Sequence, residues 1–123
     1  MTDTLRLLMV EDQHELRELI GEALRDVGIT VDTADDGHSA LRMLREHGPY
    51  DVVFSDIRMP NGMSGIELSE QVSQLLPQAR IILASGFAKA QLPPLPEQVD
   101  FLPKPYRLRQ LIAMLKGEAA ASV

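Results

Sequence analysis

Residues 5–12 of the chain are Leu-Arg-Leu-Leu-Met-Val-Glu-Asp, an apolar stretch interrupted once by Arg6 and followed directly by two acids. A short run of this kind predicts a β-strand that is buried on both faces. The run Val52-Val53-Phe54 has the same character and leads through Ser55 into Asp56. Strands that are apolar on both faces are typical of parallel sheets covered by helices, so these two runs indicate the fold class.

Helical and strand periodicities alternate along the rest of the chain. One predicted helix has its apolar face at Leu16, Leu19, Ile20, Ala23, Leu24 and Val27, and Gly28 ends it. The further helices are predicted over residues 40–47, 66–76 and 108–115, and the further strands over residues 29–34, 81–84 and 99–102. The strand over 29–34 has a more polar face that suits a sheet edge. We therefore predict an α/β fold, a doubly wound five-stranded parallel sheet with right-handed crossovers.

The crossover between the fourth and fifth strands departs from this alternation. Residues 91–96 are Gln-Leu-Pro-Pro-Leu-Pro, and prolines remove backbone donors and restrain the chain. We predict a semi-rigid loop here, with a shortened or missing fourth helix.

Composition limits the classes of protein that this chain can be. Its 123 residues, 45% of them hydrophobic, suffice for one domain, which we expect to span residues 1–123 with a core over about 5–116 and a tail over 117–123. The absence of cysteine excludes disulfides and thiolate chemistry. A net charge of −6 with scattered basic residues argues against nucleic-acid binding. Without a membrane-spanning run or a secretory signal, a cytoplasmic protein with no membrane association is expected.

Polar side chains follow the ends of four predicted strands. Glu11 and Asp12 follow the first strand, Asp56 the third, Ser85 the fourth and Lys104 the fifth. In a parallel sheet these positions meet at the carboxyl edge, where doubly wound folds place their sites. Three neighbouring carboxylates repel one another and favour a hard cation such as Mg²⁺. Lys104 and Ser85 suit phosphoryl oxygens, and Asp56 is a candidate nucleophile that becomes an aspartyl phosphate.

Five motifs, each weak alone, together match a known family in order and spacing. They are Leu-Met-Val-Glu-Asp at 8–12, Phe-Ser-Asp-Ile-Arg-Met-Pro at 54–60, Met-Ser-Gly-Ile-Glu-Leu at 63–68, Ala-Ser-Gly at 84–86 and Leu-Pro-Lys-Pro-Tyr at 102–106. In these motifs the chain resembles the receiver domain of two-component response regulators, over about residues 5–115.

The resemblance implies a flavodoxin-like sheet in the order 2-1-3-4-5. It makes Asp56 the acceptor of a phosphoryl group from a phosphohistidine on a sensor histidine kinase or phosphotransfer protein. It implies that Asp12 and Asp56 bind Mg²⁺ directly, with Mn²⁺ as a substitute, that the backbone carbonyl of Arg58 is a third ligand, and that Glu11 acts through water. Such a domain catalyses only its own phosphorylation and dephosphorylation.

The same resemblance assigns roles to residues around the acceptor. Lys104 pairs with the phosphate, Ser85 moves to hydrogen-bond it, and Phe101 is the switch aromatic that signals the change to a downstream protein. Arg58 and Phe87 flank the path of attacking water, and we expect this bulky pair to lengthen the lifetime of the phosphate. Lys104–Pro105 is expected to be a cis peptide.

Three departures from the family qualify these expectations. Asn61-Gly62 lengthens the loop after Asp56, which is similar to receivers of hybrid histidine kinases, so both a stand-alone protein and a fragment of such a kinase stay open. Glu11 replaces the commoner aspartate. The segment from Ser85 to Lys104 is shorter than usual, so the usual symmetric receiver dimer is not expected.

Three other functions fit the sequence less well. An aspartyl-phosphate phosphohydrolase usually has a second acid two residues after its nucleophile, where this chain has Arg58. A degenerate receiver that only binds proteins usually lacks an acid or the lysine, and all are present. A flavodoxin-like cofactor binder lacks support because no phosphate-binding loop follows the first strand.

Glu11-Asp12 also suits a helix cap, and the three histidines are expected at the surface: His14, His38 and His47.

Overall fold

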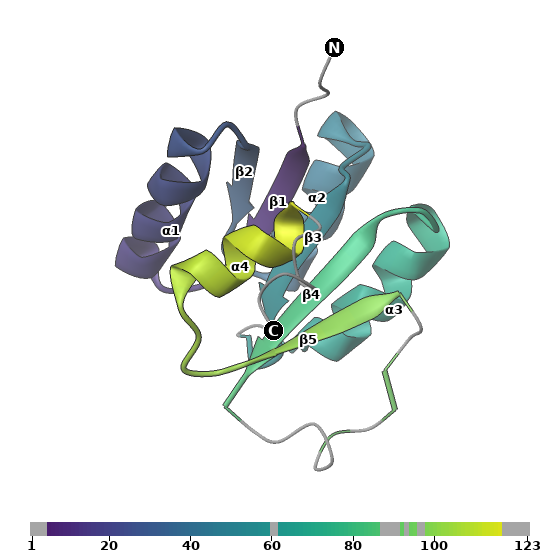
Figure 1. Cartoon of the computed structure of the whole chain (residues 1–123). Helices are drawn as coiled ribbons and strands as arrows, with labels where there is room; N and C mark the ends of the chain where they lie inside the picture. Colours follow the sequence, from purple (N-terminus) through teal and green to yellow (C-terminus); the bar gives the residue numbers. More distant parts are fainter. Residues whose placement is uncertain (1–4, 60–61, 87–91, 93, 96–97, 117–123) are drawn as a thin grey trace.

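Five parallel strands form one sheet in the order β2-β1-β3-β4-β5, with helices on both faces (Figure 1). This computed structural model describes residues 5–59, 62–86, 92, 94–95 and 98–116. The elements in chain order are β1 (Arg6–Val10), α1 (His14–Asp26), β2 (Thr30–Ala34), α2 (Gly37–His47), β3 (Val52–Asp56), α3 (Gly65–Leu75), β4 (Arg80–Ser85), β5 (Val99–Pro103) and α4 (Leu108–Leu115). The predicted fold class and strand order are confirmed, including the edge position of β2.

The connection from β4 to β5 contains no helix within the part of it that the structure describes. This agrees with the predicted shortened or missing fourth helix. Leu92 and Leu95 are partly buried against the core, whereas the rest of the 91–96 loop, apart from Pro94, lies outside the described residues. The pairing of β5 with β4 is nevertheless complete, from Ile81 opposite Val99 to Ser85 opposite Pro103.

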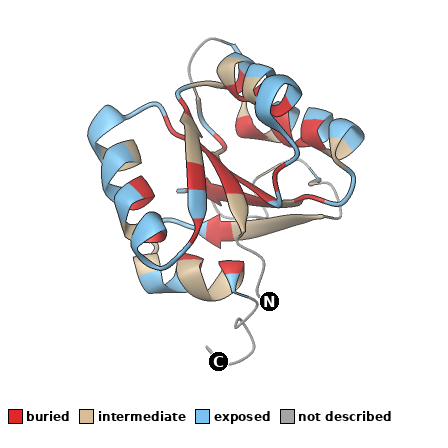
Figure 2. Ribbon diagram, turned by 90° about the horizontal axis from the view of Figure 1, so that it is seen from above, coloured by how far each residue is buried: buried red, intermediate tan, exposed pale blue. Residues whose placement is uncertain are grey.

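Alternation along the strands divides the core between the two faces of the sheet. Figure 2 shows buried positions along the strands and on the parts of the helices that face them. In β1, Leu7 and Met9 pack on the side of α1 and α4, whereas Leu8 and Val10 pack on the side of α2 and α3. All four side chains are at most 1% exposed. These four fully buried positions leave no room for a charged side chain, and Glu11 and Asp12 follow directly after them.

Helix α1 departs from the predicted apolar face. Ile20 and Leu24 are buried as expected, but Leu19 is 67% exposed and Val27 is 39% exposed. The apolar stripe of α1 is wider than the part of it that faces the sheet, so its margin is left at the surface. The predicted stripe thus marks one face of the helix, of which only part belongs to the core.

Helix α3 begins at the site edge of the sheet. Ser64 caps its first turn and Glu67 completes a capping box, with hydrogen bonds of 3.1 and 3.0 Å. Gly65 donates its backbone N–H to the carbonyl oxygen of Ile57 at 2.7 Å. A side chain at residue 65 would meet the backbone carbonyl of Asp56 and the Cα of Ile57, so glycine permits this close approach.

We expect Gly65→Ala to destabilise the protein by about 1–3 kcal/mol, because its Cβ would collide with rigid backbone rather than with a movable side chain. Gly86→Ala is the matched control, since nothing lies within 4 Å of a Cβ placed there. Urea denaturation followed by circular dichroism measures both. Equal stability of the two variants would contradict the packing argument.

Candidate functional site

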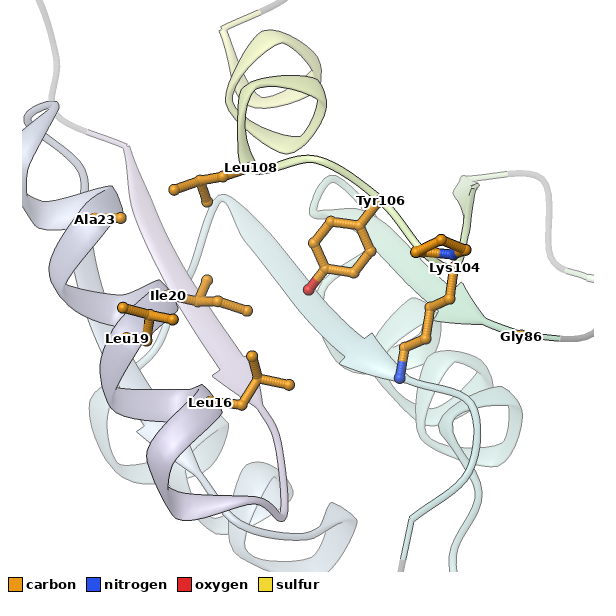
Figure 3. Close-up of a pocket in the computed structure, with 9 residues that line it drawn as sticks. Leu16, Leu19, Ile20, Ala23, Gly86, Lys104, Tyr106 and Leu108 are labelled. Atoms are coloured by element: carbon orange, nitrogen blue, oxygen red, sulfur yellow. The ribbon is translucent and has the colours of Figure 1, made fainter.

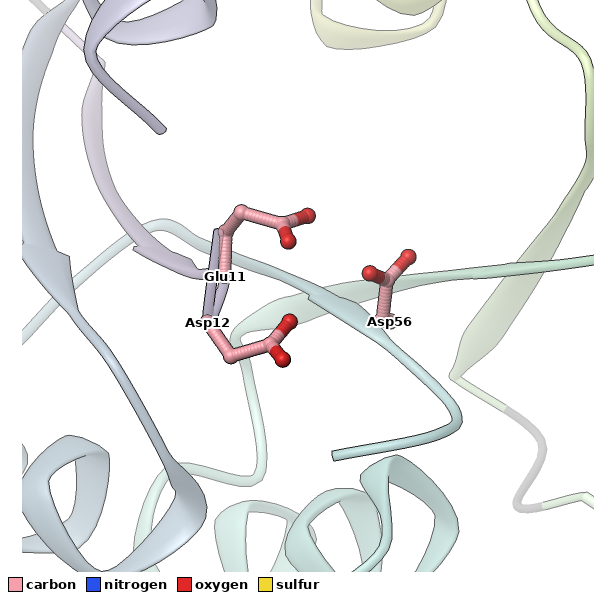
Figure 4. A group of neighbouring side chains, drawn as sticks. All are labelled: Glu11, Asp12 and Asp56. Carbon is pink, nitrogen blue, oxygen red and sulfur yellow. The ribbon is translucent and has the colours of Figure 1, made fainter. Parts of the chain in front are cut away.

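Three carboxylates converge where β1 and β3 end (Figure 4). Glu11 and Asp12 directly follow β1, and Asp56 is the last residue of β3. One carboxylate oxygen from each lies within 4.8 Å of the others. The parallel register places Val10 opposite Ser55 and so brings the two strand ends together. The acidic cluster predicted at the carboxyl edge is therefore present in the structure.

Lys104 provides the positive charge that faces this cluster. Its Nζ lies 2.7 Å from Oδ1 of Asp56, whose side chain is 12% exposed, whereas that of Lys104 is 38% exposed. The backbone N–H of Lys104 donates to the carbonyl oxygen of Ser85 at 2.7 Å, and the Lys104–Pro105 peptide is cis as expected. Ser85 is buried at the end of β4. The strand ends thus bring all four predicted positions to one edge.

Glu11 is the most buried acid of the cluster, at 6% exposed. Burial raises the pKa of its carboxyl to about 7, and Asp56 and Asp12 contribute to the increase, although the backbone N–H of Gln13 stabilises the carboxylate from 3.1 Å. That contact also settles the alternative role as a helix cap. Gln13 is the N-cap of α1 and makes no side-chain capping bond; Glu11 accepts the backbone N–H of this N-cap residue and not one from the first turn, which begins at His14.

The donor set of the cluster fits a hard divalent cation. Its three side chains offer carboxylate oxygens alone, which suit Mg²⁺ better than a metal that prefers nitrogen or sulfur. The three histidines are exposed, as expected, and none belongs to a possible metal-binding group within the described residues. Arg58, predicted to contribute its backbone carbonyl, lies in the loop that leaves Asp56.

An apolar groove adjoins the site between α1 and the segment that connects β5 to α4 (Figure 3). Its volume is about 700 Å³, and it is lined by Leu16, Leu19, Ile20, Ala23, Gly86, Lys104, Pro105, Tyr106 and Leu108. Neither the groove nor a role for Tyr106 was predicted from the sequence. The one sequence feature that could have indicated the groove is the pair of apolar residues at the margin of the apolar stripe of α1, Leu16 and Leu19.

The remaining predicted site residues are placed as follows. Phe101 is partly buried in β5 and packs against the core on the side of α2 and α3. Arg58 is exposed. Phe87 lies outside the described residues, so its proposed role beside Arg58 stays a prediction.

The sequence matches the family model of the response regulator receiver domain over residues 7–116. The chain belongs to this family.

Among curated proteins, this receiver domain is similar to the response regulator receiver protein CpdR of Brucella abortus, with 36% identity over 110 residues that cover 87% of this chain and 90% of CpdR. It is also 36% identical over 114 residues to the sensor kinase CckA of the same organism, of which the match covers 12%. The match therefore spans most of CpdR but only a small part of CckA.

Solved structures agree with the fold of this receiver domain. The receiver domain of the hybrid histidine kinase CckA superposes with a TM-score of 0.78 at 32% identity, covering 93% of this chain and 98% of that one. The response regulator TrrA of Thermotoga maritima, in complex with Mg²⁺ and BeF, gives 0.81 at 31% identity, with 94% and 99% covered. Among the described helices of this receiver, none has the length and apolar character needed to cross a membrane.

The raised pKa of Glu11 makes the metal-free stability of this receiver depend on pH. The folded state keeps the proton up to about pH 7, whereas the unfolded chain releases it near 4.5, so stability falls as the pH rises between these values. We expect Glu11→Gln to be more stable than the wild type by on the order of 1–3 kcal/mol above pH 7 and to lose that advantage below about pH 5.

Urea denaturation in the presence of a chelator, repeated from pH 4.5 to 8, measures this difference. Glu15→Gln, at an exposed position of α1, is the control for the loss of one carboxylate. A difference between wild type and Glu11→Gln that stays constant with pH would contradict the assigned proton.

Proposed function

We propose that this receiver accepts a phosphoryl group on Asp56 from a phosphohistidine of a histidine kinase or phosphotransfer protein. The observation that carries the proposal is the 2.7 Å contact between Lys104 and Asp56, next to Glu11 and Asp12. A carboxylate paired with a lysine and flanked by two further acids matches what a phosphoryl acceptor needs, namely a nucleophilic oxygen and cations for the phosphoryl charge.

In the proposed step an oxygen of Asp56 attacks phosphorus, the new O–P bond forms, and the N–P bond of the phosphohistidine breaks with its electron pair remaining on the imidazole nitrogen. Lys104 stays close enough to neutralise the phosphoryl oxygens. Mg²⁺, held by Asp12, Asp56 and the backbone carbonyl of Arg58 and through water by Glu11, would neutralise charge on the same oxygens. The Mg²⁺ and BeF bound to the related TrrA support this assignment.

The proposed switch follows from the connection between Ser85 and Lys104. The backbone bond between them and the pairing of β4 with β5 join the phosphate site to Phe101, two residues before the end of β5. In our proposal, the Ser85 hydroxyl turns to the phosphoryl oxygens and the ring of Phe101 changes position with it. A downstream protein would recognise the altered surface.

The groove beside Lys104 is the approach that we propose for the phosphodonor protein. Asp56 is 12% exposed, so a donor must reach it from the rim of the site, and the groove opens there. Its apolar wall includes Leu19, which is 67% exposed and therefore available to a partner. We propose residues 1–123 as one such receiver unit, with a core over 5–116; the predicted tail 117–123 lies outside the described residues.

Incubation with acetyl phosphate and Mg²⁺ is expected to add one phosphoryl group, which intact-mass measurement detects directly. The adduct should require both the metal and Asp56, so Asp56→Asn and the chelated wild type should show none. Asp26→Asn, at the far end of α1, is the matched control and should be labelled like the wild type. A wild-type protein that stays folded and unlabelled would refute the acceptor role.

The lifetime of the phosphate tests the proposed roles of Arg58 and Phe87. If these side chains obstruct attacking water, Arg58→Ala and Phe87→Ala should each shorten the half-life of the phosphoprotein, and the double variant should shorten it further. The half-life is measured by mass after removal of the donor. Half-lives equal to that of the wild type would remove both residues from this role.

A further inference from the structure

Tyr106 presents a hydroxyl to the groove that the packing of the protein does not require. Its ring contacts Phe54 edge to face, with centroids 5.9 Å apart and an interplanar angle of 79°. A phenylalanine would make this contact equally well. Among the described residues the hydroxyl has no hydrogen-bond partner, although Figure 3 shows it directed into a groove whose wall is mostly leucine, isoleucine and alanine. The hydroxyl is thus available to an occupant of the groove.

From its position, the Tyr106 hydroxyl would contact the leaving group and not the phosphoryl group. Lys104 already contacts Asp56, and the phosphorus must lie next to both. In an in-line transfer the leaving group lies on the side of phosphorus away from Asp56. Lys104 and Tyr106 line the same groove. A leaving group at the mouth of this groove would therefore lie beside the Tyr106 hydroxyl.

The hydroxyl is a proton donor at every pH at which the domain would work. Burial raises the pKa of Tyr106 to about 12, and the negative charges of Asp56 and Glu11 add to the increase. The ring is held by Phe54, so little conformational freedom is lost when the hydroxyl engages a ligand.

We propose that Tyr106 is a specificity-determining residue whose hydroxyl hydrogen-bonds the far ring nitrogen of an N-phosphorylated imidazole as its phosphoryl group passes to Asp56. This inference rests on the proposed acceptor function. As the N–P bond breaks, its electron pair stays on the imidazole nitrogen and negative charge spreads to the opposite nitrogen of the ring. The Tyr106 O–H donates to that nitrogen, and the final proton comes from solvent. An acetate leaving group has no such second ring nitrogen.

The test compares two small donors, phosphoimidazole and acetyl phosphate, in the presence of Mg²⁺ by intact-mass kinetics. For Tyr106→Phe we expect the ratio of the phosphoimidazole rate to the acetyl phosphate rate to fall roughly three- to ten-fold, the range for one hydrogen bond. Tyr50→Phe is the control because the Tyr50 hydroxyl donates instead to Asp32 at 2.6 Å, and its ratio should match that of the wild type.

Each outcome decides between the inference and its alternatives. An unchanged ratio in a folded Tyr106→Phe protein overturns the inference, whether both rates are preserved or both fall together. A wild-type protein that neither donor phosphorylates at Asp56 refutes the acceptor function itself, which is a separate result. A lowered ratio in Tyr106→Phe with an unchanged ratio in Tyr50→Phe supports the role of the hydroxyl.

Discussion

The fold holds three carboxylates, those of Glu11, Asp12 and Asp56, closer together than three like charges would settle in water. The electrostatic repulsion between them is the constraint on which the site depends. The parallel pairing of β1 with β3 imposes it, since the acids follow strands whose apolar side chains are fixed on both faces of the sheet. Part of the repulsion is relieved by the Lys104 ammonium, and part by retention of a proton on Glu11. The folded core thus maintains an arrangement that the site residues alone would not adopt.

The same geometry connects Asp56 to the two strands at one end of the sheet. Asp56 is linked to Lys104 by an ion pair, and Lys104 to Ser85 by a backbone hydrogen bond. A new group on Asp56 therefore competes for the ammonium of a residue that is anchored to the neighbouring strand. β5 is an edge strand and is paired on one side alone, so it can adjust more easily than β1, β3 and β4, each of which is paired on both sides.

Much of the fold and of the site could be predicted because the signals are local. Runs that are apolar on both faces specify buried parallel strands, and a polar residue after each run, such as Asp56 or Lys104, must lie at the carboxyl edge. The exposure of Leu19 could not be predicted, because helical periodicity shows which residues share a face but not how much of that face the sheet covers. Tyr106 was missed because its surroundings come from α1 and β3, far away in the sequence, and the cis peptide at Gly48–Pro49 had no recognised signal.

The complete pairing of β5 with β4, without a helix in the described part of their connection, bears on how such a chain can diverge during evolution. Lys104 takes its place from the register of β5 against β4 and from its bond to Ser85. The segment between the two strands is therefore not needed to position Lys104. Insertions, deletions and proline substitutions there can be inherited without displacing Lys104, so this segment is free to diverge among lineages of such domains.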